Sequence, residues 1–410
     1  MKFQEVIGQE SVKEQLVKLV NNNRLSHALL FLGKEGNGSL SLALAFSQFI
    51  VCRDTAAQQL KSSLTGLFDS EPVSGSEYSD SCGICPACIK ASQFIHPDIH
   101  YSYPVITRKT GEKPISSDYI IQWREFIKAQ PYGNVYDWLQ FIGAENKQGN
   151  ITAEECNNIN KKLSLKSFES KYKILVMWMP EFLGREGNKL LKLIEEPPPD
   201  TLFIFIAENE SAILPTILSR TQLIKIPPLF DTEVEQALVL SEGQNESKSR
   251  QISAVSEGNY REALQLLEHN DEDWQGILRE WLNTILKTGP AAQVKWIEEM
   301  SKFGREKQKQ FIRYFIHLLE QAVRLRVLDG HQHSGDSAVH ALFTNIPEKE
   351  RDFAFRLNKM CSLSAQQAII TELDKATWYI ERNANGKILF HALSIRLYHI
   401  IKDNSLILIN

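Results

Sequence analysis

Residues 27–51, HALLFLGKEGNGSLSLALAFSQFIV, combine an apolar run, a glycine-rich turn and a second apolar segment. The pattern predicts a buried strand at 27–33 followed by a helix at 39–51. Gly33 and Gly38 stand at the two glycine positions of a phosphate-binding loop, G-x-x-x-x-G-K-[ST]. A strand before such a loop and a helix after it are the context that a nucleotide-binding α/β domain requires.

The side chains that handle a nucleotide are missing. Ser39 replaces the loop lysine, and Leu40 replaces the hydroxyl that ligates magnesium. A hydrolase of this class also ends a later strand with an Asp for magnesium and a Glu for water. In KILVMWMPEF these positions hold Trp178 and Met179, which serve neither purpose. The losses argue against ATP hydrolysis. Passive binding of ATP or ADP stays open, because backbone N–H groups could still hold an anion at Gly33, Gly36, Gly38 and Ser39.

The composition is that of a globular protein, with 43% hydrophobic and 23% charged residues. The net charge of -4 gives no global basic field of the kind that marks a stand-alone nucleic-acid binder. The start, MKFQEVIGQESVKEQL, has no signal-peptide pattern, and the longest apolar runs are too short to span a bilayer. We therefore expect a cytoplasmic protein without membrane contacts.

Apolar runs that alternate with amphipathic segments predict a parallel sheet in the first half of the chain. Strands are expected at 27–33, 99–105, 173–179, 201–207 and 222–226, and helices at 9–21, 39–51, 151–164 and 186–195. The polar stretch 53–81 interrupts this alternation and is expected to be a mobile surface loop. Residues 106–149 are rich in aromatics and predict either a helical insertion that packs them internally or a partner-docking surface. After the two prolines of IPPLF, the pattern is helical.

Four cysteines predict a metal site. SCGICPAC places Cys82, Cys85 and Cys88 at consecutive C-x-x-C spacings, and Cys52 closes the preceding helix. Four thiolates match a closed, tetrahedral structural zinc site. His96, in HPD, is an alternative fourth ligand or a loop cap.

Two arginines stand in patterns that could carry function. Arg220 follows Ser219 before the last expected strand, and it is either a surface charge or a finger that reaches a neighbour's γ-phosphate. Arg261, in SEGNYREAL, could be an ordinary charge on a helix surface.

These pieces occur in the order of a known family. The chain resembles the delta-prime subunits of bacterial DNA polymerase III clamp loaders, members of the AAA+ superfamily. The resemblance rests on FQEVIGQESVKEQLVKLVNNNRLSHALLFLG, CGICPACIKASQFIHPD and NKLLKLIEEPPPDTLFIFIAENESAILPTILSRTQ. It is dense over residues 1–228 and weaker through SEGNYREALQLL and NANGKILFHALSIRL.

The resemblance implies three domains. An AAA+ α/β core at 1–228 would hold the zinc module at about 82–98 and insertions at 53–81 and 106–149. A small helical lid at 229–272 and an all-α collar at 273–410 would follow.

The resemblance also implies roles for single residues. Arg220 matches the trans-acting arginine finger, next to Ser219, and Arg261 matches the sensor-2 arginine. The glycine loop would be a relic, and ATP would not be hydrolysed there. The zinc ligands would be Cys52, Cys82, Cys85 and Cys88. Thr221 stands where the family has a cysteine after Ser-Arg.

The implied assembly is a pentamer of three gamma/tau motor subunits, one delta subunit and this chain. It would open the sliding clamp and load it onto primed DNA in the nucleoid-associated replisome. Two alternatives are an ATP-hydrolysing motor subunit of the same complex and a stand-alone, zinc-dependent nucleic-acid-binding protein.

Overall fold

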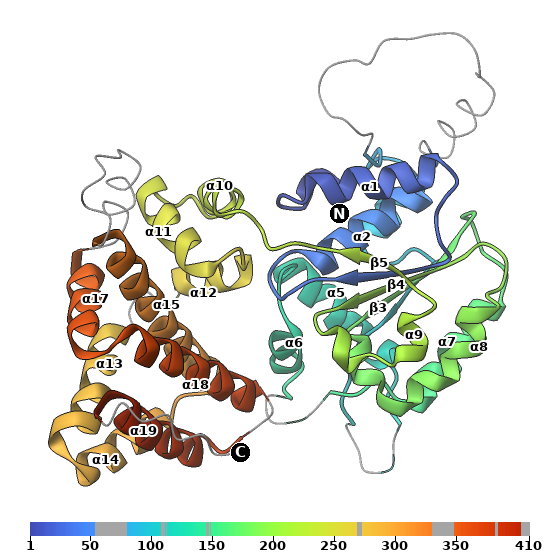
Figure 1. Ribbon diagram of the computed structural model, residues 1–410. Coiled ribbons are helices and arrows are strands. Elements are labelled where there is room, and N and C mark those ends of the chain that lie inside the picture. Colours follow the sequence, from blue (N-terminus) through green and yellow to red (C-terminus); the bar gives the residue numbers. More distant parts are fainter. Residues whose placement is uncertain are drawn as a thin grey trace. The chain divides into compact units, whose positions relative to one another are not determined.

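The computed structural model describes residues 1–53, 80–107, 111, 113–144, 147, 149–268, 273–329, 348–381 and 384–402 (Figure 1). The chain divides into two compact units, Met1–Glu268 and His269–Asn410. Most of the predicted loop at 53–81 lies outside the described residues. The three-domain boundaries expected from the family resemblance stay predictions.

The first unit is built on a five-stranded parallel sheet with the order β2-β3-β4-β1-β5. Its strands are β1 (Ala28–Leu32), β2 (Ile99–Ser102), β3 (Lys173–Trp178), β4 (Thr201–Ala207) and β5 (Gln222–Lys225). The predicted parallel α/β core is confirmed. β2 ends earlier than expected because the next backbone N–H, that of Tyr103, bonds to the Ser116 hydroxyl at 3.1 Å instead of a strand.

Helices cover both faces of this sheet (Figure 1). Alternate strand residues point to opposite faces, so each face has its own core. One face packs against α1 (Glu10–Asn21) and α2 (Ser39–Val51), and the other against α7 (Ala153–Ser164), α8 (Leu191–Glu195) and α9 (Pro215–Leu218). The helix expected at 186–195 is wrong in its first half. A 3-10 segment, Pro180–Leu190, precedes α8, with Gly184 in the left-handed region at φ 50°.

The aromatic insertion packs into the first face. It forms a 3-10 turn (Ser116–Tyr119), α5 (Ile120–Ala129) and α6 (Val135–Phe141). Trp123, Phe126 and Trp138 are all buried, and the Tyr103 ring stacks on Trp123 with centroids 4.0 Å apart. The sequence left open whether these aromatics pack internally or form a partner-docking surface, and the three named here pack internally.

Helices make up most of the described residues after β5. α10 (Asp231–Glu242), α11 (Glu246–Ser256) and α12 (Tyr260–Glu268) complete the first unit around a small core of their own. The second unit packs around Trp281 and Trp296, whose stacked rings lie 5.0 Å apart. Within the described ranges, no helix combines the length and the apolar character needed to cross a membrane. The described helices of the second unit are α13 (Trp274–Asn283), a π turn (Thr284–Thr288), α14 (Pro290–Met300), α15 (Arg305–Asp329), α17 (Glu348–Met360), α18 (Leu363–Glu381) and α19 (Gly386–Lys402).

Candidate functional site

The glycine loop leaves the carboxyl end of β1, between the ends of β4 and β5. Gly36 and Gly38 have positive φ values of 73° and 86°, and Gly38 begins helix α2. A Cβ at Gly36 would lie 1.7 Å from the Asn259 side-chain oxygen, so only glycine fits there. The backbone thus keeps the strand, loop and helix arrangement of a phosphate-binding loop.

Asn37, within the loop, occupies the donors that a phosphate would use. Its buried side-chain oxygen accepts hydrogen bonds from the Ser39 backbone N–H at 3.0 Å and from the Ser39 hydroxyl at 2.6 Å. Its amide donates to the Ile226 carbonyl at 2.9 Å. Sequence reasoning missed Asn37. An Asn just before a helix is a known capping signal and could have suggested it.

The cavity beside the loop is small. Its volume is about 20 Å³, and the carboxyl ends of β1, β3 and β4 line it together with Tyr132. That is room for about one water molecule, whereas ligand pockets span roughly 300–1,000 Å³. The Tyr132 ring lies 2.9 Å from where a Cβ on Gly38 would be, and its hydroxyl accepts the Ile7 N–H at 2.8 Å. In this conformation Tyr132 and the loop backbone leave only this small cavity beside the glycines.

The position of the missing magnesium ligand is part of the hydrophobic core. Trp178, at the end of β3, is 3% exposed and contacts the rings of Trp123 and Phe126 at centroid distances of 5.2 and 6.1 Å. Glu181 is close in sequence, but its carboxylate accepts the backbone N–H groups of Glu208 and Asn209, at 2.7 and 2.9 Å. Burial raises the pKa of Glu181, although the two hydrogen bonds act in the opposite direction. This acidic group therefore holds a loop in place.

Arg261, at the predicted sensor-2 position, forms a buried ion pair with Asp137 of α6. Its Nη2 lies 2.6 Å from Asp137 Oδ1, and its Nε contacts Oδ2. The two side chains are 4% and 13% exposed. The insertion thus supplies a carboxylate to the arginine that, by the family resemblance, would face a nucleotide.

Neighbouring contacts join the loop, the insertion and α12 at the same place. Glu35 of the loop accepts the side-chain amides of Asn134 at 2.7 Å and Asn259 at 3.4 Å. The Tyr260 N–H donates to the Gly36 carbonyl at 3.1 Å. Together with the ion pair, these bonds hold the insertion and the α12 segment closed over the loop.

Arg220 lies at the surface beyond α9, with a side chain 34% exposed. Its guanidinium pairs with Glu195 and donates to the Thr216 carbonyl at 2.8 Å and to the Ser219 hydroxyl at 3.1 Å. These bonds fix the arginine beside the end of α8 while leaving part of it open to solvent.

The structure brings the four predicted cysteines together. The sulfurs of Cys52, Cys82, Cys85 and Cys88 all lie within 4.8 Å of one another, and those of Cys82 and Cys88 are 3.9 Å apart. Four thiolates at about 2.3 Å from a zinc ion would be about 3.8 Å apart, so the cluster fits such an ion. Backbone N–H groups point at three of the sulfurs, at 3.4 to 3.5 Å. Burial raises the pKa of the Cys88 thiol, and a bound cation would reverse that preference.

His96 has a different role from the cysteines. Its ring is buried, Nδ1 accepts the Asp98 N–H at 3.1 Å, and Nε2 lies 3.2 Å from both Ser170 Oγ and Glu169 Oε1. The interpretation of His96 as a loop cap agrees with these contacts.

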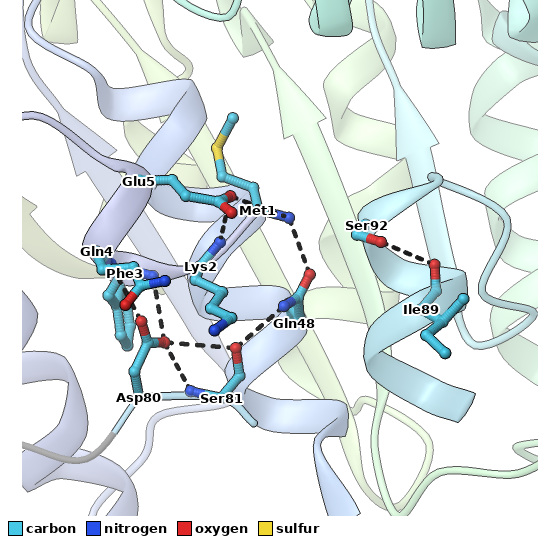
Figure 2. A network of polar contacts seen from close by, with 10 residues as sticks. All are labelled: Met1, Lys2, Phe3, Gln4, Glu5, Gln48, Asp80, Ser81, Ile89 and Ser92. Atoms are coloured by element: carbon cyan, nitrogen blue, oxygen red, sulfur yellow. Dashed lines mark hydrogen bonds and ion pairs between the residues drawn. The ribbon is translucent and has the colours of Figure 1, made fainter. Parts of the chain in front are cut away.

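Polar contacts join the segments that lead into Cys52 and Cys82 (Figure 2). Gln48, in the last turn of α2, donates to the Ser81 hydroxyl at 3.0 Å. The Asp80 carboxylate accepts the N–H groups of Phe3 and Gln4 at 3.2 and 3.1 Å. Asp80 and Ser81 directly precede Cys82, so the cluster is tied to the first residues of the chain and to α2.

A parallel sheet with a glycine loop after β1 and a helix directly after the loop is the arrangement of the nucleotide-binding type of α/β domain that the sequence predicts. A family model described as "DNA polymerase III, delta subunit" matches residues 8–230. The chain belongs to this family, which confirms the resemblance to clamp-loader subunits.

Relatives include both delta-prime and tau subunits. The chain is 25% identical over 265 residues to the DNA polymerase III subunit delta' of Bacillus subtilis, covering 64% of this chain and 60% of that one. Identity to the B. subtilis subunit tau is 22% over 316 residues, covering 75% and 44%. Identity to the Pseudomonas aeruginosa subunit delta' is 27% over 195 residues, covering 48% and 41%. The chain thus spans less than two thirds of the length of each of these relatives.

Proposed function

We propose that this chain is a non-hydrolysing, delta-prime-type subunit of the replicative clamp loader. The observation that carries the proposal is the buried pair of Arg261 and Asp137. In an active subunit an arginine at this position would meet the nucleotide, as the family resemblance implies. Here a carboxylate of the same chain neutralises it, beside a cavity of about 20 Å³. Similarity to tau subunits keeps an active motor subunit as the alternative, and this geometry speaks against it.

The chain would act through its neighbours. In the proposed assembly with three gamma/tau subunits and one delta subunit, Arg220 would leave Glu195 and bind the γ-phosphate of an adjacent motor subunit. Such a finger is worth about 10³–10⁵ in rate where it acts. Hydrolysis would then require a docked neighbour, which couples ATP turnover to assembly while the clamp is loaded onto primed DNA.

The four cysteines would hold a structural zinc ion. All four coordination positions would be filled by thiolates, so no position is left for catalysis. The ion would fasten the end of α2 to the segment that begins at Asp80.

Reconstituted ATP turnover tests the proposal. A complex that contains the Arg220→Ala chain, with clamp and primed DNA, should lose most of its turnover while its subunits still co-elute. The Glu195→Gln chain, which frees the arginine without removing it, should retain turnover and serves as the matched control. Unchanged turnover with Arg220→Ala would refute the finger, and ATP hydrolysis by the isolated chain would favour the motor subunit.

A further inference from the structure

The loop between α7 and β3 exposes two large apolar side chains. Phe168 is 81% exposed and Leu165 is 68% exposed. They lie on the same short connection, which runs from Ser164, the last residue of α7, to Lys173, the first of β3. An isolated apolar residue on a surface needs no explanation, but a pair held on one rigid loop does.

Two buried charged side chains, Asp98 and Lys173, hold the backbone of this loop. The Asp98 carboxylate accepts three successive backbone N–H groups, those of Phe168, Glu169 and Ser170, the last two at 2.8 Å. Burial opposes the charge on Asp98, yet these bonds lower its pKa. The Lys173 ammonium donates to the carbonyls of Leu163 and Leu165. Phe168 is therefore displayed on a fixed backbone and loses little conformational freedom when it binds a partner.

The segment around Phe168 in the sequence is basic. Residues 161–171 contain four lysines, Lys161, Lys162, Lys166 and Lys171, and one acidic residue, Glu169. The Glu169 side chain is 14% exposed and turns to Lys90 at 2.6 Å and His96 at 3.2 Å. Within the described residues none of the four lysines forms an ion pair. In a chain of net charge -4, this loop is a local positive patch.

Helix electrostatics explain only part of this pattern. Lys161 and Lys162 lie in the last turn of α7, where cations stabilise the helix dipole. Lys166 and Lys171 lie beyond the helix. The Lys171 ammonium lies 5.1 Å from the centre of the Tyr172 ring, which brings a cation and a second aromatic together on the same loop.

We propose that this loop binds single-stranded nucleic acid. Phe168 would stack on an unpaired base, and the four lysines would contact the flanking phosphates. An acidic peptide would satisfy the charge, but its apolar side chains need a pocket, and Phe168 projects from the surface. A duplex offers phosphates but no free base face. The inference does not depend on the proposed role in the clamp loader.

Fluorescence anisotropy with a labelled oligo-dT of about 30 nucleotides tests the inference on the full chain. Single strands give a slope of about -0.7 per neutralised phosphate, so four lysines predict a slope near -3 in log K against log salt. Affinity should then fall about 50-fold between 50 and 200 mM salt. Stacking of one base predicts that Phe168→Ala weakens binding at least about fivefold, and Lys166→Glu should also reduce the slope.

Matched variants keep the test specific. Phe230 is 73% exposed elsewhere, and Phe230→Ala should leave binding unchanged. Lys295→Glu on α14 is the charge control. The inference is overturned if the chain does not bind oligo-dT, if Phe168→Ala and Phe230→Ala bind alike, or if a duplex of the same length binds as tightly. Displacement of oligo-dT by an acidic aromatic peptide at equal charge concentration would also assign the loop to a protein partner and overturn it.

Discussion

Replacing Asp137 by Asn removes the charge that Arg261 faces while keeping the shape of the side chain. One amide oxygen remains for the Asn134 N–H, which Asp137 Oδ2 accepts at 2.9 Å. Loss of one partner from a buried ion pair costs about 3–5 kcal/mol, because the other charge is left buried and unpaired. Asp137 is 13% exposed and Arg261 4%, so we expect a loss near the lower limit, about 3 kcal/mol.

Urea unfolding and calorimetry measure this loss. Each kcal/mol lowers the melting temperature of a domain of this size by roughly 2–4 °C, which predicts a fall of about 6–12 °C for Asp137→Asn. Hydrogen exchange gives a local readout. The amide of Tyr260, bonded to the Gly36 carbonyl, should exchange faster once α12 loosens from the loop.

Two further variants separate this ion pair from a general effect of charge. Glu235→Gln removes a partner of Arg250, whose side chain is 62% exposed, and should cost less than about 1 kcal/mol. An apolar double variant, Asp137→Leu with Arg261→Met, should recover most of the lost stability because no charge is left unpaired. A loss below about 1 kcal/mol for Asp137→Asn, with unchanged exchange at Tyr260, would refute the view that this pair closes the loop.

Three other predictions concern the cysteine cluster, His100 of β2 and the glycine loop. The purified chain should carry one zinc ion, and Cys85→Ser should lower both the zinc content and the free energy of unfolding; equal metal content in the two proteins, by elemental analysis, would count against the site. Burial, aided by Lys162, lowers the pKa of His100 from 6.5 to about 4. The contribution of the neutral ring to the free energy of unfolding is therefore complete above pH 6.5 and is lost as the pH falls toward 4. His100→Gln should therefore flatten the urea-unfolding profile between pH 7 and pH 4 by on the order of 3 kcal/mol, and an unchanged profile would contradict this. Ser39→Lys should not restore ATP binding in calorimetric titrations, because Tyr132 still packs on the loop; micromolar binding would show that the missing lysine is the only defect.

The sheet and the cysteine cluster were predictable because their signals are local. Runs such as TLFIFIA at 201–207 are buried on both faces, and the observed β4 spans the same residues. The spacing of Cys82, Cys85 and Cys88 is enough to predict a metal site. The closure of the loop was not predictable in this way. Asp137 and Arg261 are 124 residues apart, and no periodicity links them.

The closed loop is compatible with Ser39 and Leu40 but not with the lysine of a phosphate-binding loop. Ser39 and Leu40 are 8% and 5% exposed, and α2 is buried over nearly its whole length. A lysine at position 39 would have to bury its charge without a phosphate to pair with, which is costly. Ser39 instead donates hydrogen bonds to Asn37, so both side chains can be buried within the glycine loop. α2 then connects the closed loop at Gly38 to Cys52 of the cysteine cluster, so the loop and the cluster are the two ends of one buried helix.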